Sequence, residues 1–445
     1  MNLKSDSIKG RVARLYHFAY SIAGEGNDAA IPKYLEELPF DVRSYDSGAE
    51  VNGWTVWPGR RIEVAEIRMD GDLIYDGKAS PLGVIERSAS FRGTIDRDEL
   101  REHLHFSTDH DDAITWHCRQ LYRPTEPDWG FCVPYPLYES LKPGYYDVDL
   151  SIRELPSSMK VLDFQLTGTE GRTIVLNAHN CHPYQANDDI SGVAVGIEVM
   201  KRLGKCINRR FTYRLVIAPE LTGTVHWLDE MAPSGIDMVG AILLKSVGND
   251  APLKLQESFT GASTLDRAAH HVMRQRYGTY ESGSFRTIYG NDEIAFEAPG
   301  FEVPSITLTR YPFAEYHTDL DTPDRLSESA LADTADAAFE ICMAMEMDVT
   351  LQATRVGLPC LSHPRFDLYV PVWDPSVRTG PAKDADRAWN LLMNRLPRYL
   401  DGSSGLLEIA DQHGLPIETV YDYAMRWVDK GLARVSKPKS SDTAT

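Results

Sequence analysis

Hydrophobic and polar positions follow two different patterns in the first third of this chain. Residues 8–39 place apolar side chains at helical spacing, with a glycine-rich break before residue 31. From residue 41 to about residue 110 the apolar runs are short and rich in β-branched and aromatic residues, and Asp, Gly and Pro turns separate them. This second pattern predicts a small, mostly antiparallel β unit.

Beyond residue 130 the pattern becomes one of strands that alternate with helices. Continuous apolar runs mark the predicted strands at 161–166, 173–178, 213–218, 240–244 and 303–308. Helical stretches are expected at 192–203 and 327–347. Continuous apolar strands that alternate with helices are typical of a mainly parallel sheet covered on both faces, so the predicted fold class is α/β.

The end of the chain changes character once more. Residues 351–380 contain several prolines and glycines and are predicted to be a linker. A helix, a glycine turn, a second helix and a short strand over 381–436 are typical of a winged helix-turn-helix, and the polar residues 437–445 are predicted to form a disordered tail. The expected main α/β domain comprises 1–40 and 125–350, with an inserted β-rich domain at 41–124.

Polar side chains with metal-binding chemistry follow several of the predicted strands. His179 and His182 come after the strand at 173–178, Glu220 follows the next strand, and His317 follows the last. Asp188 precedes a predicted helix, whose positive end favours an ionised carboxylate. Because ligands bind at the carboxyl ends of strands in open α/β sheets, we expect these imidazoles and carboxylates to lie together and hold a zinc-type ion with one position open for water.

Three segments resemble the metal-binding segments of the M28 zinc aminopeptidases. They read His-Asn-Cys-His-Pro-Tyr-Gln-Ala-Asn-Asp-Asp-Ile-Ser-Gly at 179–192, Ala-Pro-Glu-Leu-Thr-Gly-Thr at 218–224 and Tyr-His-Thr-Asp-Leu-Asp-Thr at 316–322. More closely, the chain resembles the bacterial "aminopeptidase-like" family of the DUF4910/DUF2172 type. The inserted β region, the Asp-Glu motif within 291–304 and the C-terminal winged helix share in this resemblance, which covers nearly the whole chain.

The resemblance implies roles for individual residues. His182, Asp188 and His317 are the expected metal ligands, although His179 is an alternative to His182 because the spacing to Asp188 does not decide between them. Two-zinc relatives have a Glu-Glu pair, the first a general base and the second a ligand, where this chain has Pro219 and Glu220. Glu220 is therefore expected to be either a ligand or the base.

The missing carboxylate leaves a second acid or base to be found. Glu293 is the candidate, because burial near a metal-bound water would suit it to proton transfer. Asp292 beside it, together with His179, is predicted to bind the substrate, whose free amino group needs an acidic anchor. A solvated loop pair is the alternative interpretation of Asp292 and Glu293.

One metal ion per chain is expected. The strand at 240–244 is followed by Lys245, where two-zinc relatives have an aspartate ligand, and a lysine ammonium would oppose a second cation. Zinc is the predicted ion, although the same nitrogen and oxygen donors also accept Fe, Mn, Co or Ni.

Charge and composition exclude several other classes of partner. The net charge of −19 argues against binding to nucleic acid or to an anionic membrane. Residues 385–435 carry six positive and seven negative side chains, so the winged helix is predicted to pack or to form a homo-oligomer and not to read DNA. The six cysteines are scattered without a CxxC pair, and the N-terminus lacks the apolar core of a signal peptide, so a cytoplasmic protein is expected.

The predicted function is that of a zinc-dependent aminopeptidase or amidase that acts on a short peptide or a small aminoacylated intermediate. A catalytically inactive binding scaffold and a winged-helix regulator that senses a ligand are the alternatives. Trp54, Trp57 and Trp129 are interpreted as the core of the β unit in preference to a substrate cleft, and Cys181 as a buried cysteine in preference to a nucleophile.

Overall fold

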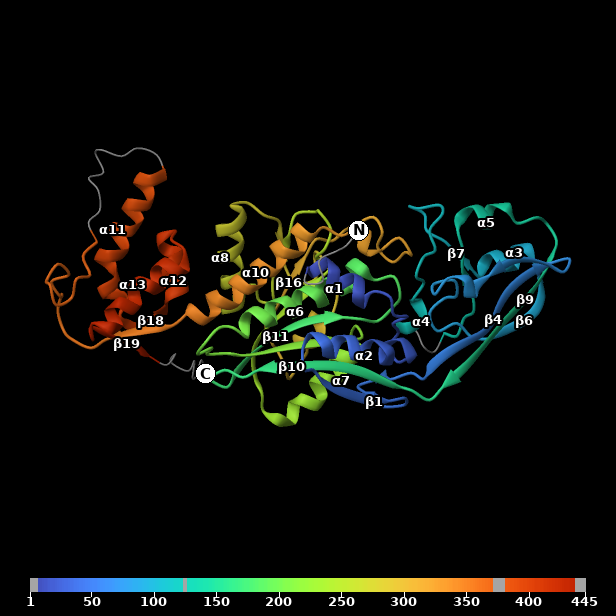
Figure 1. Ribbon diagram of the computed structural model, residues 1–445, viewed down its shortest axis with the longest axis horizontal. Helices are drawn as coiled ribbons and strands as arrows, with labels where there is room; N and C mark the ends of the chain where they lie inside the picture. Colours follow the sequence, from blue (N-terminus) through green and yellow to red (C-terminus); the bar gives the residue numbers. More distant parts are fainter. Residues whose placement is uncertain (1–6, 123–125, 371–380, 437–445) are drawn as a thin grey trace. The chain divides into compact units, whose positions relative to one another are not determined.

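The computed structural model describes residues 7–122, 126–370 and 381–436 and divides the chain into two compact units. The first unit comprises residues up to 261 together with 281–336, and the second comprises 262–280 together with the chain from 337 onward. Both units are drawn in Figure 1, and each is described here by itself. Among the described residues, no helix is long and apolar enough to cross a membrane.

The first unit is organised around an eight-stranded mixed sheet. Its strand order is β1-β10-β12-β11-β13-β16-β14-β15. The strands are β1 (Asp41–Asp46), β10 (Ser158–Leu166), β11 (Arg172–His179), β12 (Thr212–Ala218), β13 (Asp237–Lys245), β14 (Lys254–Gln256), β15 (Ser282–Gly283) and β16 (Ser305–Thr309). The four central strands β12, β11, β13 and β16 are parallel, whereas β1, β10 and β14 pair in the antiparallel sense. The predicted α/β class is confirmed, but the sheet is mixed because antiparallel strands flank its parallel centre.

Helices pack on both faces of this sheet. On one face, α6 (Ser191–Leu203) contacts β11, β12 and β13, and α1 (Ile8–Leu15) packs on α6. Gly196 permits this approach, because a Cβ atom there would meet the Leu215 side chain at 2.8 Å. On the other face, Trp227 of α7 (Thr222–Met231) and Phe296 of α9 (Glu293–Phe296) join the valines of the central strands in one apolar core. The remaining helices of this unit are α2 (Glu25–Glu37), α3 (Arg97–Glu102), α4 (Arg119–Tyr122) and α5 (Tyr135–Ser140).

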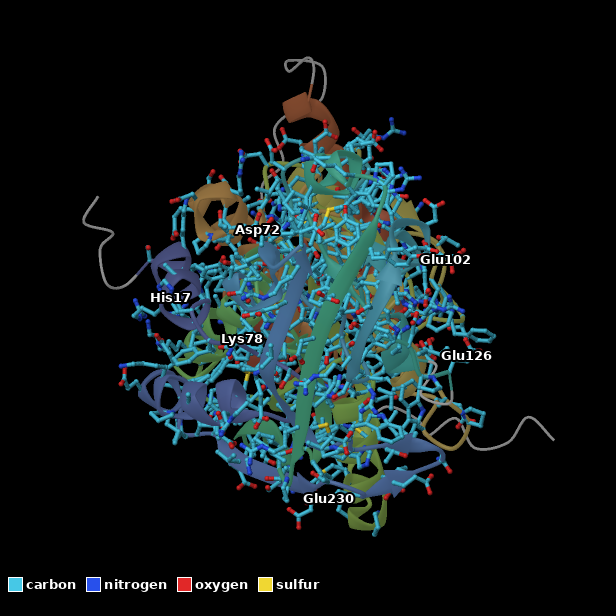
Figure 2. All side chains as sticks on the ribbon, turned by 90° about the vertical axis from the view of Figure 1, so that its right-hand side faces the viewer. His17, Asp72, Lys78, Glu102, Glu126 and Glu230 are labelled. Carbon is cyan, nitrogen blue, oxygen red and sulfur yellow. The ribbon has the colours of Figure 1, made fainter. Side chains whose placement is uncertain are left out.

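A second sheet in the first unit has the strand order β5-β4-β9-β6 and is antiparallel throughout. Its strands are β4 (Gly59–Met69), β5 (Asp72–Asp76), β6 (Phe91–Asp96) and β9 (Tyr145–Leu155). Figure 2 looks onto this sheet, with Asp72 and Glu102 on opposite sides of it. Two short pairs accompany it, β2 (Glu50–Val51) with β3 (Trp54–Thr55) and β7 (Leu104–His105) with β8 (Phe131–Cys132).

The boundaries predicted for the β-rich region, 41–124, do not match the strand pairing. Strand β1 belongs to the large sheet, where Asp41–Asp46 pairs with β10, and β9 belongs to the smaller sheet although it begins at Tyr145. The sequence could not show this, because a half-exposed antiparallel strand has the same alternating pattern in either sheet. Trp129 packs on the core of this region, where it stacks on Phe91 with ring centroids 4.0 Å apart.

The second unit contains a three-stranded sheet and four helices, together with the C-terminal end of α10 (Glu328–Met347). The sheet has the order β18-β17-β19, formed by β17 (Thr350–Ala353), β18 (Asp401–Gly405) and β19 (Ala433–Ser436). The helices are α8 (Thr264–Tyr277), α11 (Pro381–Tyr399), α12 (Leu406–His413) and α13 (Ile417–Asp429).

Two predicted boundaries in this region require correction. Residues 350–353 form the central strand of the three-stranded sheet, so the beginning of the predicted linker 351–380 is ordered structure. Helix α8 was assigned to the main domain but packs with the C-terminal helices, where the His271 Nδ1 atom lies 2.8 Å from Asp411 Oδ1. Residues 371–380 of the linker and the tail 437–445 lie outside the described residues. The winged-helix assignment stays a prediction.

Candidate metal centre and active site

The predicted site residues lie where the parallel strands of the large sheet end. His179 is the last residue of β11, and Lys245 is the last residue of β13. Glu220 follows β12, and His317 lies in the loop after β16. Parallel strands end at one edge of a sheet, so four segments that are far apart in sequence meet there.

Three of these side chains form what we call the histidine cluster: His182, Asp188 and His317. The Nε2 atoms of His182 and His317 lie 3.5 and 3.2 Å from the same oxygen of Asp188, Oδ2. Potential ligand atoms of the three residues all lie within 4.8 Å of one another. Two imidazoles and one carboxylate form a donor set of the kind found in catalytic zinc sites.

The ring nitrogens of the two candidate ligands, His182 and His179, have different hydrogen-bond partners. His182 Nδ1–H donates a hydrogen bond to the carbonyl oxygen of Pro183 at 2.8 Å, which leaves the lone pair of Nε2 free. His182 Nε2 is buried and has no hydrogen-bond partner among the described residues. His179 differs, because its Nδ1 accepts from the Lys245 ammonium at 3.1 Å and its Nε2 faces Asp188 Oδ1 at 3.2 Å.

Asp188 is held in place as an anion. Burial alone would raise the pKa of this carboxyl group, but the adjacent imidazoles of His179, His182 and His317 hold the pKa well below its usual range. The Tyr289 hydroxyl also donates to Asp188 Oδ1 at 3.2 Å. The backbone N–H of Asp188 donates to Asp321, which fixes the turn that carries it. Neither Tyr289 nor Asp321 was given a role from the sequence, although Asp321 lies within the quoted segment 316–322.

A second buried group, here called the lysine cluster, comprises Lys245, His179, Asp189 and Asp292. The Lys245 side chain is fully buried, and its Nζ atom lies 3.2 Å from Asp292 Oδ2 and 3.6 Å from Asp189 Oδ2. Burial lowers the pKa of Lys245, but the charges of Asp292, Asp189 and Glu220 outweigh burial and raise it. Burial and the adjacent ammonium lower the pKa of His179, which is therefore neutral. The expected ammonium is therefore present as a charged group beside the histidine cluster.

His179 also belongs to another set of side chains that are close enough to hold a metal, together with Cys181 and Glu220. Burial raises the pKa of the Cys181 thiol well above its ordinary value, so this group is a thiol and not a thiolate. The Lys245 ammonium occupies the hydrogen-bonding position on His179 and would repel a cation there. The histidine cluster is therefore the better site for a metal ion.

Glu220 lies beside the histidine cluster and is only partly exposed. Burial, followed by the charges of Asp292 and Asp188, raises its pKa to about 8. The side-chain amide of Asn291 donates to Glu220 Oε1 at 2.9 Å and orients the carboxyl group. A carboxyl group with this pKa is suited to exchange protons near neutral pH.

The acids of the Asp-Glu motif, Asp292 and Glu293, form hydrogen bonds with the groups around Glu220. Both carboxylate oxygens of Glu293 accept from the Asn291 backbone N–H, and Oε1 also lies 3.0 Å from Arg286 Nη1. Asp292 accepts from the Leu221 backbone N–H at 2.6 Å through Oδ1 and from Lys245 through Oδ2. Burial raises the pKa of Glu293. Both acids are buried, so the interpretation as a solvated loop pair is wrong.

Trp116 is a further component that sequence reasoning missed. Its ring stacks on His182 with centroids 4.0 Å apart and meets His317 edge-on at 4.7 Å. The Trp116 backbone N–H donates to the His317 carbonyl at 2.7 Å, and an isolated bridge joins Thr115 to Thr318. No periodic pattern surrounds Trp116 in the sequence, so only the folded chain shows this contact.

The residues of the histidine cluster fit a bound transition metal. Burying an imidazole nitrogen without a hydrogen-bond partner costs free energy, unless a ligand or a metal ion binds to that nitrogen. Its lone pair, a second imidazole nitrogen and an ionised carboxylate oxygen face the same point. This donor chemistry is the one that zinc and related ions require.

Comparisons with known proteins identify relatives of this chain. A Clostridium acetobutylicum protein named "Putative polysaccharide biosynthesis protein with aminopeptidase-like domain" is 26% identical over 346 residues, which are 77% of this chain and 78% of that protein. The crystal structure of a putative peptidase from the same organism has a TM-score of 0.81 at 23% identity and covers 96% of both chains.

Two other bacterial peptidases share the fold more distantly. The Bacillus subtilis zinc aminopeptidase BSAP has a TM-score of 0.58 at 13% identity, over 76% of this chain and 94% of that chain. The Peptidase M28 precursor from Shewanella amazonensis has a TM-score of 0.56 at 14% identity, over 78% of this chain and 93% of that chain. The fold of the chain is thus aminopeptidase-like. Residues 10–348 match the model described as "Domain of unknown function (DUF4910)", and the chain belongs to that family.

Proposed function

We propose that this protein is a hydrolase that depends on one zinc ion and cleaves an amide bond next to an amino acid group. The observation that carries the proposal is the buried, unpartnered Nε2 atom of His182, which faces Asp188 and His317. An aminopeptidase-like fold and a relative named for such a domain support the same reaction class.

In this mechanism His182, Asp188 and His317 hold the metal ion. When bound there, the ion would polarise the substrate carbonyl and lower the pKa of water. Glu220 accepts the proton of the attacking water and returns it to the leaving amine, for which a pKa near neutrality is required. Asn291 orients the Glu220 carboxyl group through its amide.

Glu293 and Asp292 act as positioning residues in this proposal. The contacts of Glu293 with Asn291 and Arg286 use its carboxylate, so we replace its predicted acid-base role with support of Asn291. Both oxygens of Asp292 are engaged by Leu221 and Lys245. We propose that Asp292 fixes these two groups and does not anchor a substrate amine, and that His179 orients Asp188.

The C-terminal unit is proposed to be a winged helix that packs or forms a homo-oligomer. The order of α11, β18, α12, α13 and β19 supports this assignment. Helix α13 would be the DNA-reading helix, but it carries Glu418, Asp422 and Asp429, whereas a DNA-reading surface is basic.

A metal titration tests the proposed reaction. Chelator-treated and dialysed protein receives zinc in steps, while hydrolysis of dipeptides, L-leucine p-nitroanilide and N-acetyl amino acids is measured. We expect activity that saturates at one equivalent of zinc. Saturation at two equivalents would contradict the single-metal mechanism, and bound zinc without hydrolysis of any substrate would favour a binding scaffold.

The substrate is proposed to be small. The name of the Clostridium relative refers to polysaccharide biosynthesis, which suggests an aminoacylated biosynthetic intermediate as well as a short peptide.

A further inference from the structure

A cavity of about 650 Å³ lies in the first unit, outside the groups that the proposed mechanism uses. It is lined by the segment 19–26, the beginning of β4 with Trp57 before it, the loop 84–87, Trp116 and Pro183. Pockets that bind small molecules have volumes of roughly 300–1,000 Å³. The cavity is thus large enough for a metabolite or a short peptide.

The wall of this cavity is shared with the histidine cluster. Trp116 lines the cavity and also stacks on His182. Pro183 lines the cavity too, and its carbonyl oxygen accepts a hydrogen bond from His182 Nδ1–H. A molecule in the cavity would therefore lie against residues that directly contact a proposed metal ligand. This position suits the part of a substrate that extends away from the scissile bond.

Two arginines in the cavity wall lack ionic partners. Within the described part of the chain, no carboxylate lies at ion-pair distance from Arg60 or Arg87, and the Arg60 Nε atom is buried without a hydrogen-bond partner. Other arginines of this region are paired, for example Arg61 with Glu25 and Arg92 with Asp149. Of the three arginines that line the cavity, Arg61 is therefore paired, whereas Arg60 and Arg87 are not.

Trp57 and the backbone of Arg87 fix the geometry of this group. The Arg87 guanidinium lies over the Trp57 ring, 4.1 Å from its centroid, so the charge is held in one place. Arg87 has a φ of 57°, a left-handed conformation that is unfavourable for a non-glycine residue. Strain of this kind is found where a side chain must point in a particular direction.

The electrostatics of the cavity favour an added negative charge. Burial lowers the pKa of Arg60, and burial followed by the repulsion of Arg60 lowers the pKa of Arg87. Glu86 and Glu154 partly offset this repulsion from a longer distance. Of the acidic lining residues, Glu25 and Asp28 face Arg61 and Lys160, and Glu86 lies beyond ion-pair distance of Arg60 and Arg87. Two desolvated guanidinium groups without a carboxylate in contact are suited to bind a planar carboxylate or a phosphate by paired hydrogen bonds.

We propose that Arg60, Arg87 and Trp57 form a subsite that binds an anionic group, a carboxylate or a phosphate, of the substrate. This inference rests on the proposed function for its place in the reaction, because the subsite holds the part of the substrate remote from the scissile amide. It narrows the substrate class to acidic molecules, such as a peptide with an acidic side chain or an aminoacylated sugar phosphate.

Binding of simple anions tests the subsite without the metal. Inorganic phosphate and glutarate are titrated by calorimetry into chelator-treated, dialysed wild-type protein and into Arg60→Met, Arg87→Met, Glu86→Gln and Arg92→Met. We expect at least one anion to bind, at least 10-fold weaker binding in Arg60→Met and Arg87→Met, and no change in the control Arg92→Met. Glu86→Gln should bind the anion several-fold more tightly, because it removes an opposing charge. The preferred anion distinguishes a carboxylate from a phosphate as the substrate group.

Melting temperatures separate a binding role from a structural one. Arg60 and Arg87 have no ionic partner, so their methionine variants should melt at or above the wild-type temperature. Wild-type protein that binds neither anion, or arginine variants that bind as tightly as wild type, would overturn the proposal.

Hydrolysis distinguishes failure of the subsite from failure of the proposed function. Zinc-loaded wild type should prefer Leu-Glu over Leu-Gln. Arg60→Met and Arg87→Met should reduce this preference at least 10-fold, whereas the control Arg92→Met should retain it. Equal activity on both dipeptides overturns the subsite and leaves the hydrolase intact. Anion binding without hydrolysis of any amide overturns the proposed function and leaves the anion site.

Discussion

The histidine cluster and the lysine cluster lie side by side at one edge of the sheet. Their buried carboxylates face different kinds of group. Asp292 and Asp189 of the lysine cluster face an ammonium group that belongs to the protein. Asp188 of the histidine cluster faces imidazole nitrogens, one of which has no partner. One cluster is thus neutralised by the chain itself, and the other requires an added cation.

This difference is the structural basis of the proposal that the protein uses a single ion. A fixed ammonium at Lys245 provides a positive charge where a second metal would otherwise lie, and it repels a cation from His179 and Cys181. It also sets the His179 ring so that Nε2 faces Asp188 Oδ1 as a donor. In the proposed mechanism, Lys245 thereby directs the metal to the histidine cluster.

Removal of a histidine-cluster ligand should have the largest effect. His182→Ala and His317→Ala are expected to lose zinc and to reduce hydrolysis by more than 100-fold, since even loss of a residue that only orients a ligand costs about 10–100-fold. Metal analysis of the purified variants and kcat/KM measure this. His17→Ala, at an exposed histidine of the same unit, is the control. Full zinc content in His182→Ala would show that His179 is the ligand instead.

Glu220→Gln tests whether the residue between the two clusters is a base or a ligand. The substitution retains the shape of the side chain and a carbonyl oxygen for the Asn291 hydrogen bond. Loss of general-base catalysis should lower kcat by about 10²–10⁴-fold, while zinc content and KM stay nearly constant. A large loss of zinc affinity in this variant would instead identify Glu220 as a ligand.

Lys245→Met should lower the free energy of unfolding more than the substitution of any surface residue. It leaves Asp292 buried without its cation, and loss of one partner of a buried ion pair costs about 3–5 kcal/mol. Urea unfolding of the chelator-treated protein measures the free energy of unfolding. The matched control Lys254→Met removes a pair with the exposed Glu281 and should cost at most about 1 kcal/mol. A cost of similar size in both variants would show that the lysine cluster is not needed for folding.

The sequence predicted the candidate ligands because each stands beside an element with a clear pattern. The apolar runs of β11, β12 and β16 identify buried strands, and the side chains of His179, Glu220 and His317 follow them closely. Because parallel strands end at the same edge of a sheet, the sequence alone predicts that such residues lie close together. The position of Lys245 at the same edge could be predicted in the same way, because Lys245 is the last residue of β13.

Contacts between segments that have no pattern were not predictable. Trp116 and Asn291 reach the site from loops, and their contacts depend on how those loops fold over the strands. The same limit explains the boundary errors at β1 and β17, since short alternating strands do not show which sheet they join. The choice between His179 and His182 likewise needed the hydrogen bonds of Pro183 and Lys245.

Proton release on metal binding is the smallest expected effect, and it tests the link between the clusters most directly. The pKa of Glu220 is about 8, above the ordinary value for a carboxyl group, so the metal-free protein holds this proton at pH 7 and loses it above pH 8. A cation at the histidine cluster favours the carboxylate and lowers this pKa, so zinc binding at pH 7 should release the proton. At pH 9 the proton is already absent, and the release should disappear.

Calorimetric titration of zinc in buffers with different ionisation enthalpies counts the protons released. Wild type should release about one proton more than Glu220→Gln at pH 7, and the two should release equal numbers at pH 9. The subtraction removes protons that both proteins release, including any from bound water. Asp188 adds none because its pKa is well below 7, and burial has already lowered the pKa of His317. Equal release by the two proteins at pH 7 would mean that the carboxyl group of Glu220 does not sense the metal, and the assignment of Glu220 as the base would fail with it.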